Sequence, residues 1–432
     1  MKKTKILQGA WRKGGLHSHT LWSDGRSLPE RAIAAVIKNG FDFWCISEHC
    51  CFPDNPDAWR EVCRDEGPWP PNLTDEEFAA AQNIVPGYPE VKPSNPWKKL
   101  ARLMTFREMC KAFNKPDKFL LIPGSEFTPW LGVCPDGRNY CVHANWLNIP
   151  QSADLPPVKS PTAMLDKFYA AYQEAAGKSR RESCFMLNHP FWPYFDILST
   201  DMHTRPEIFL AEICNGGPNY PAPDAMPSME QWWDGANSFR IAKGMPCIYG
   251  TASDDTHFYD DDRAAHCHGG LNGGFVVIHL PGHMTANRIM RALKNGDFYA
   301  STGVFFDSIV MDYEHGLLKV KVRRTSGAKK CHIRFNGTKR GFDRTITTRF
   351  IPYETNHEFD RDVPVYSADV GQILAEKDGW TAEYKLAPDD MYVRATAVID
   401  VPHERRNDVP DRYYPKYLTA WTQPMISEYP VK

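Results

Sequence analysis

The segment GGLHSHTLWSDG, residues 14–25, places two histidines one residue apart and an aspartate shortly after them. In an extended strand, residues i and i+2 point to the same face. His17 and His19 would therefore direct two imidazoles at one point, with Asp24 in the turn that follows. This geometry suits a metal ion, and its interpretation depends on what the rest of the chain contributes.

Length and composition limit the class of protein. A chain of 432 residues favours two or three domains. Its 42% hydrophobic and 24% charged residues are typical of a globular protein. A net charge of −2 argues against nucleic acid or an anionic membrane as partner. No stretch reaches the roughly 18 apolar residues of a membrane span, and the basic N-terminus lacks the apolar segment of a signal peptide. We therefore expect a cytoplasmic protein.

The cysteines do not indicate disulfides. The chain has 12 of them, without any CxxC pair. Several lie in apolar segments, where a free thiol packs as a small hydrophobic group; these are Cys45, Cys141, Cys184, Cys214 and Cys247. A disulfide framework is therefore not expected.

Apolar runs rich in β-branched residues recur through the first 280 residues. Such runs, separated by helix-length segments, predict a parallel sheet buried on both faces, and seven or eight of them favour a closed β/α barrel. The runs are GLHSHT (15–20), FDFWCISEH (41–49), FLLIPGSEFT (119–128), YCVHANWLNI (140–149), SCFMLNH (183–189), IFLAEICNGG (208–217), PCIYGTASDDTH (246–257) and GFVVIHL (274–280).

The first connecting helix has clear signals at both ends. Ser27 and Glu30 have the spacing of a capping box, and Asn39-Gly40 marks the end of the helix. Its apolar face would consist of Ala32, Ile33, Val36 and Ile37.

Two segments interrupt the alternation. Residues 50–118 form a Pro- and Trp-rich insertion with a helical pattern over 97–113, which we interpret as a lid or specificity element. Residues 217–245 are a Pro-rich loop that leads into a helix. RIMRALKNGDFYASTG then predicts a further helix that ends in a glycine turn.

The pattern changes after about residue 305. Alternation of apolar and polar residues with period two predicts antiparallel strands with one wet face. We therefore divide the chain into an α/β barrel over 1–304 and a small antiparallel β-sandwich over 305–432. The alternating segments are 317–324, 329–337, 381–387 and 391–400.

Histidines and carboxylates recur at the carboxyl ends of the predicted barrel strands, where barrel chemistry is found. A single such histidine is more often a hydrogen-bonded core residue, but nine polar groups buried together without partners would cost about 1–3 kcal/mol each. Because Zn²⁺ takes about four ligands, the set predicts two or three divalent ions, Zn, Mn or Fe. The nine candidates are His17, His19, Asp24, His49, Glu126, His143, His189, Asp255 and His257.

The ordered motifs resemble a known superfamily. HSHTLWSDG, ISEH, GSEFT, VHANW, NHP and SDDTH are similar to the motifs of PHP (polymerase and histidinol phosphatase) metallohydrolases over about residues 12–300. The tail from GDFYASTG to AWTQP resembles the β-domain of a branch that includes predicted metal-dependent phosphoesterases and carbaryl-hydrolase-like enzymes. The resemblance implies a distorted, TIM-like (β/α)7 barrel with up to three metals at its carboxyl rim.

The resemblance also implies how the metals are held. The implied sets are His17, His19, Glu126 and Asp255; Glu126, His143 and His189; and Asp24, His49 and His257. One departure is visible, since the usual Thr-Asp-His reads Ser47-Glu48-His49 here; because His49 is retained, we expect the change to affect residues around the ligands. Asp254, beside Asp255, could orient a histidine.

The implied chemistry is hydrolysis by a hydroxide that bridges the metals, with Asp255, Glu126 and His257 as catalytic residues. No GxSxG motif offers a serine nucleophile. We expect a phosphoesterase that acts on a small organic phosphate ester. The alternatives are a carboxylic-ester, carbamate or amide hydrolase with the same centre, and a non-catalytic glycan-binding protein.

Candidate substrate contacts complete the prediction. Arg26 and Arg263 could contact a phosphate or be ordinary surface arginines. His266 and His268 could protonate a leaving group or be polar loop residues without a role in the reaction. Four tryptophans follow ligands by three or four residues and could form an aromatic wall or pack beneath the loops; they are Trp22, Trp130, Trp146 and Trp192. The expected partner is a small molecule. The β-domain packs on the barrel or mediates homo-oligomerisation.

Overall fold

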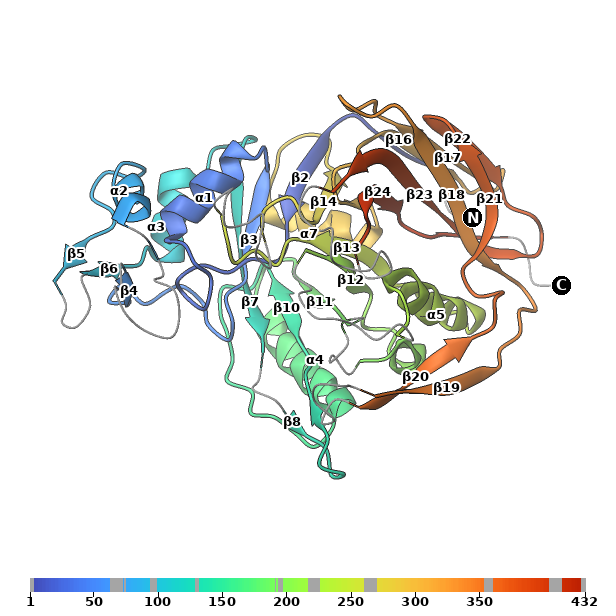
Figure 1. Ribbon diagram of the computed structural model, residues 1–432, viewed down its shortest axis with the longest axis horizontal. Helices are drawn as coiled ribbons and strands as arrows, with labels where there is room; N and C mark the ends of the chain where they lie inside the picture. The colour runs from blue at the N-terminus through green and yellow to red at the C-terminus, as the bar shows by residue number, and fades with distance from the viewer. Residues whose placement is uncertain are drawn as a thin grey trace.

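A mixed 14-stranded sheet runs through the computed structural model (Figure 1). The structure describes residues 4–62, 73, 75–93, 99–128, 132–190, 192, 197–216, 226–259, 270–352, 360–403 and 414–428. In sheet order the strands are β13 (Tyr249–Ser253), β12 (Leu210–Asn215), β11 (Cys184–Leu187), β10 (Ala144–Leu147), β7 (Leu120–Phe127), β3 (Phe43–Ile46), β2 (Trp11–Gly15), β14 (Phe275–His279), β15 (Phe298–Ser301), β24 (Tyr417–Thr422), β23 (Asp390–Pro402), β18 (Cys331–Lys339) and β21 (Gln372–Asp378), with β25 (Met425–Ile426) beside β23.

Smaller sheets and the helices surround this sheet. The smaller sheets are β1 (Lys5–Gln8), β16 (Phe306–Asp312), β17 (Leu317–Val322) and β22 (Thr381–Lys385); β4 (Trp59–Val62), β6 (Lys99–Arg102) and β5 (Val91–Lys92); β8 (Gly132–Val133) and β9 (Asn139–Tyr140); and β19 (Ile346–Ile351) and β20 (Arg361–Tyr366). The helices are α1 (Pro29–Lys38), α2 (Asp75–Ala81), α3 (Phe106–Phe113), α4 (Pro161–Lys178), the 3-10 helix η1 (Ser199–Thr204), α5 (Met229–Ala242) and α7 (Ala286–Asn295).

The strands occur where the apolar runs predict them, but the purely parallel sheet is wrong. β10 is antiparallel to both β7 and β11, and β14 is antiparallel to β2. The described part of the connection between β7 and β10 contains the β8–β9 pair and no helix. Without a crossover the chain returns in the opposite direction. β10 therefore begins at the edge of the sheet where its two antiparallel neighbours, β7 and β11, end.

Closure into a barrel is not seen in the strand order. Among the described residues, β13 lies at the end of the hydrogen-bonded sheet. A parallel bridge nevertheless joins Ser18, after β2, to Thr256, after β13. His19 N donates to Thr256 O at 2.8 Å. The segments that follow β2 and β13 are therefore in contact at the edge of the sheet that carries the predicted site.

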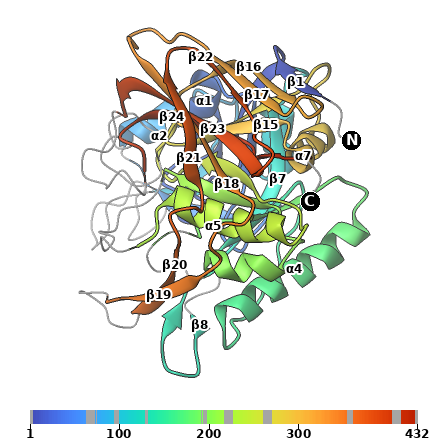
Figure 2. The ribbon, with the colours of Figure 1, turned by 90° about the vertical axis from the view of Figure 1, so that its right-hand side faces the viewer.

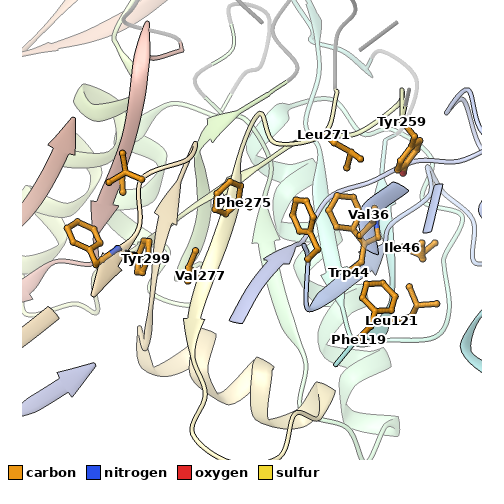
Figure 3. Packing of buried hydrophobic residues seen from close by; sticks show 14 of the residues in the cluster. Val36, Trp44, Ile46, Phe119, Leu121, Tyr259, Leu271, Phe275, Val277 and Tyr299 are labelled. Atoms are coloured by element: carbon orange, nitrogen blue, oxygen red, sulfur yellow. Dashed lines mark hydrogen bonds between the residues drawn. The ribbon is translucent and has the colours of Figure 1, made fainter. Parts of the chain in front are cut away.

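Helix α1 begins later than its capping signal predicts. Its N-cap is Leu28, without a side-chain cap, so the expected Ser27–Glu30 box does not form. Pro29 at the first helical position, where proline is favoured, fixes the start instead. The end is as predicted: Asn39 is the C-cap, and Gly40 has a φ of +73°. Val36 of α1 packs with Trp44 and Ile46 of β3 in the core (Figure 3).

The insertion is only partly helical. Thr105 and Glu108 form a capping box that starts α3 at Phe106, so the helix predicted over 97–113 is too long. Lys99–Arg102 instead forms β6, which is paired with β4 and β5. The start of the predicted helix and residues 217–225 of the Pro-rich loop lie outside the described residues. The helix predicted after that loop is present as α5, and α7 ends at Gly296 as expected.

The C-terminal strands are antiparallel, as predicted. They are joined to the N-terminal part by sheet pairing, since β24 pairs β15 and β1 pairs β16. Figure 2 shows α5 close to β18. Between α5 and β23, Arg394 Nη2 lies 2.5 Å from Asp234 Oδ2, and both side chains are buried. The C-terminal strands therefore pack on the N-terminal part. No helix in the described ranges has the length and apolar character needed to cross a membrane.

Side-chain contacts also reach the free edge of β13. The amide of Gln423 accepts from Gly250 N at 2.8 Å and donates to Gly250 O at 2.9 Å. The Gln423 side chain therefore makes the two backbone hydrogen bonds at Gly250 that a neighbouring strand would make. Because Asp255 and His257 directly follow β13, the C-terminal segment supports the strand from which these site residues extend.

Candidate metal centre

The nine predicted ligands come together at one edge of the large sheet. Glu126 lies in β7, and His49 pairs with it through an isolated parallel bridge. His143 precedes β10, and the antiparallel direction of that strand is what brings it to the same edge. His189 and Asp255 have positive φ values of 26° and 51°. Such backbone conformations are costly in residues other than glycine and concentrate at functional sites.

Glu126 lies at the centre of the cluster and is buried. Its two oxygens face five imidazoles, which is the arrangement expected of a carboxylate that bridges cations. The distances to its nearest oxygen are 3.1 Å from His17 Nε2, 3.5 Å from His19 Nε2, 2.8 Å from His49 Nδ1, 3.4 Å from His143 Nδ1 and 3.6 Å from His189 Nε2.

Two further carboxylates extend the cluster. Asp255 Oδ1 lies 3.2 Å from Nε2 of both His17 and His19. Asp24 Oδ1, on the solvent side, lies 3.2 Å from Nε2 of both His49 and His257. Three groups of residues have potential ligand atoms within 4.8 Å of one another; they are His17, His19 and Asp255; His17, Glu126 and His189; and His19, Asp24, His49 and His257.

The donor set fits divalent cations. His17 Nε2, His19 Nε2 and Asp255 Oδ1 are buried and have no hydrogen bond within the described part of the chain. Buried polar atoms usually have a partner. Ligand atoms about 2.1 Å from one ion lie about 3.0–3.4 Å from each other, close to the separations found here. The geometry therefore leaves the buried donors aimed at points that a cation can occupy.

Hydrogen bonds fix which ring nitrogen faces the cluster. His17 Nδ1 donates to Glu212 Oε1 at 2.8 Å, so in the neutral imidazole Nε2 carries the lone pair. His257 Nδ1 donates to the backbone oxygen of Asp255 at 2.8 Å, which leaves its Nε2 toward Asp24. A histidine that binds a metal commonly donates its other N–H in this way.

The electrostatics favour the ligand forms of several groups. Burial alone would raise the pKa of Glu126, but His17, His49 and His143 lower it well below its usual range. Burial, with His49 and His257 nearby, lowers the pKa of His19 to about 3. Burial opposes protonation of His17, yet Asp255 and Glu126 raise its pKa well above 6.5. Metal ligation needs neutral imidazole, so cation binding would release a proton from His17.

One buried glutamate, Glu212, was missed as a functional residue. Glu212 accepts from His17 Nδ1, and its Oε2 accepts from His189 N at 2.9 Å. It therefore has the role suggested for Asp254, which instead accepts backbone hydrogen bonds from Asn272 and Gly274. The signal was a glutamate within the apolar strand LAEICN, because a carboxylate buried in a strand requires partners.

Glu48 holds the turn that carries the first ligands. It accepts from Thr20 Oγ1 at 2.6 Å, from Thr20 N at 3.0 Å, and from Ser23 Oγ at 2.6 Å. The residue that departs from the family motif thus contacts the backbone between His19 and Asp24.

Of the two alternatives for the four tryptophans, an aromatic wall or packing away from the cavity, packing holds for Trp22 and Trp146. Trp22 is buried and donates to Met104 O of the insertion at 2.9 Å. Trp146 is buried against Phe127, with ring centroids 4.2 Å apart. Trp192 does line the site and stacks on His189 at 4.1 Å. Trp130, Arg263, His266 and His268 lie outside the described residues.

A cavity of about 360 Å³ opens on the centre. Besides seven of the candidate ligands, Arg26, Trp192 and Phe258 line it. Arg26 N donates to His257 O at 2.7 Å, which ties the arginine backbone to the site. Arg26, which the sequence offered as a phosphate contact, therefore lies beside the candidate ligands.

No protein-family model and no curated protein sequence matches the chain. Its solved structural neighbours include a two-domain protein from Bacteroides vulgatus that contains a predicted PHP-like metal-dependent phosphoesterase, with 12% identity, 98% of each chain covered and a TM-score of 0.37. They also include Endonuclease Q bound to a DNA duplex with an abasic lesion (12%, 66% of this chain and 57% of that one, 0.31) and an amidohydrolase from Chromobacterium violaceum (11%, 65% and 96%, 0.26).

Proposed function

We propose that the protein is a metal-dependent hydrolase and that its substrate is a small organic phosphate ester. The observation that carries this proposal is the convergence of the nine side chains around Glu126. We assign His17, His19, Glu126 and Asp255 to one ion, Glu126, His143 and His189 to a second, and Asp24, His49 and His257 to a third. For the architecture we propose a distorted (β/α)7 barrel over 1–304, closed near Ser18 and Thr256, and a β-sandwich over 305–432.

The chain's own residues would organise the reaction. Divalent ions bound here would lower the pKa of water and stabilise charge on the ester oxygens. Glu126 and Asp255 supply negative charge that holds cations close together. Glu212 fixes the orientation of His17, and the stacked ring of Trp192 covers one side of His189. His257 donates its Nδ1–H to the backbone oxygen of Asp255, which would leave its Nε2 to hold the third ion.

Arg26 favours phosphorus over carbon as the electrophile. Arg26 lines the cavity with Asp255 and His257, and a guanidinium makes charge-assisted hydrogen bonds to phosphate oxygens. A neutral carboxylic ester, carbamate or amide has no anionic oxygen that would need this charge. That reaction at the same centre remains the second candidate function.

The assay compares p-nitrophenyl phosphate with p-nitrophenyl acetate, with and without a chelator. We expect chelator-sensitive phosphate release, and Arg26→Ala should raise the KM for the phosphate about tenfold while leaving any acetate hydrolysis unchanged. Arg288→Ala, on the exposed part of α7, is the control for loss of an arginine. Chelator-sensitive acetate hydrolysis without phosphate release would move the function to the second candidate.

A further inference from the structure

A second, larger cleft leads away from the metal centre. Its volume is about 640 Å³, and it shares Asp24, His49 and His143 with the lining of the central cavity. A group attached to a scissile bond at the centre can therefore extend into this cleft without leaving the protein surface. The lining residues beyond the shared ones include Phe127, Cys141, Leu155, Pro156, Pro157 and Phe168.

The cleft is mainly apolar. No Lys or Arg occurs among the described residues that line it. Its carboxylates are Asp24, which lies against His49 and His257, and Asp154. The carboxylate of Asp154 disfavours an anionic group in the cleft. Aliphatic and aromatic side chains gain free energy by covering an apolar group. The lining therefore selects an uncharged, apolar moiety.

A third pocket, which shares Ser23 and Asp24 with the cleft, has a more polar lining. That pocket, of about 400 Å³, is lined by Arg26, Arg60 and Glu61 from the main body and the insertion. Arg60 donates to the backbone oxygens of Leu21 and Trp22 at 2.9 Å and 3.0 Å, so its position is fixed. The two openings that share Ser23 and Asp24 therefore differ in lining, since arginines line one and none of the described residues that line the other is Lys or Arg.

We propose that the Leu155 cleft binds the apolar alcohol or phenol portion of the substrate, which makes the substrate class phosphate monoesters of apolar alcohols or phenols. This inference rests on the proposed function. In the reaction, water adds its oxygen to phosphorus, the bond from phosphorus to the ester oxygen breaks, and the leaving oxygen receives a proton. The released alcohol then lies in the cleft beside His143 and Leu155.

The test uses one apolar and one polar ester together with a ligand that requires no turnover. The two esters are biphenyl-4-yl phosphate and glycerol 2-phosphate, and the metal-loaded enzyme is assayed with each to obtain kcat/KM. Binding of biphenyl-4-ol is followed by its fluorescence in loaded and in chelated protein. Leu155→Asp places a third carboxylate in the cleft, and Leu155→Met restores apolar surface. Ile373→Asp, on the exposed face of β21, is the matched control.

We expect the biphenylyl ester to be preferred, and the ratio of the two kcat/KM values should fall about tenfold in Leu155→Asp. Leu155→Met and Ile373→Asp should keep the ratio. Biphenyl-4-ol should bind with or without metal and lose affinity in Leu155→Asp. Hydrolysis of both esters with equal efficiency, and no phenol binding, would overturn the cleft assignment and leave the hydrolase intact. Phenol binding that depends on Leu155, without hydrolysis of either ester, would support the cleft and overturn the proposed function.

Discussion

Glu126→Gln is expected to lower phosphate-ester turnover on the order of a thousandfold. The substitution keeps the shape of the side chain and removes its charge. Glu126 is buried and lies within 3.6 Å of a nitrogen of each of five histidines. In the proposed centre it bridges two ions, so loss of its charge weakens both. Steady-state kinetics with p-nitrophenyl phosphate measures the effect.

The control for this variant is Glu182→Gln. Glu182 pairs at the surface with Lys294 and Arg291, and its loss should leave turnover unchanged. Because an uncompensated histidine cluster could destabilise the Glu126 variant, near-ultraviolet circular dichroism and bound metal are recorded on the same sample. A folded Glu126→Gln protein with wild-type turnover would contradict the proposed centre.

Asp234→Ala should lower the free energy of unfolding by about 3 kcal/mol. Asp234, on α5, is contacted by Arg394 Nε at 3.0 Å, Arg394 Nη2 at 2.5 Å and Tyr392 OH at 2.8 Å. Arg394 is fully buried on β23 and, among the described residues, would keep Glu230 as its remaining partner carboxylate. Removing one partner of a buried pair leaves a charge without its compensation. Urea denaturation measures the change.

Glu383→Ala is the matched control for this prediction. Its pair with Lys319 joins two half-exposed side chains on β22 and β17. Such surface pairs contribute about 0–1 kcal/mol. Equal losses in the two variants would show that the buried pair between α5 and β23 adds no special stability.

The sequence predicts the positions of strands better than their directions. Apolar runs located β3, β7, β11, β12 and β13 because a buried strand needs apolar residues whichever way it runs. The direction of β10 depends on the connection that precedes it, where Pro135-Asp136-Gly137 is a turn signal for the β8–β9 pair that the pattern of apolar runs does not include. The start of α1 at Pro29 instead of Ser27 shows a similar competition between two local signals.

The predicted ligands lie together because strand ends share an edge, whereas the tryptophan wall depended on details beyond strand order. Trp146 lies within β10, and its neighbour Asn145 donates inward to Leu16 O. Alternation along the strand then directs Trp146 to the opposite face, against Phe127. Trp22 packs on the insertion, whose fold the sequence does not reveal.

Metal content of the purified protein tests the central claim most directly. After equilibration with Zn, Mn or Fe salts and removal of the excess, inductively coupled plasma mass spectrometry should find about two to three ions per chain, since nine ligands exceed the need of one ion. Dialysis against a chelator should remove the ions and abolish the hydrolytic activity. A folded protein that retains no ion under any of these conditions would contradict the metal centre and the hydrolase built on it.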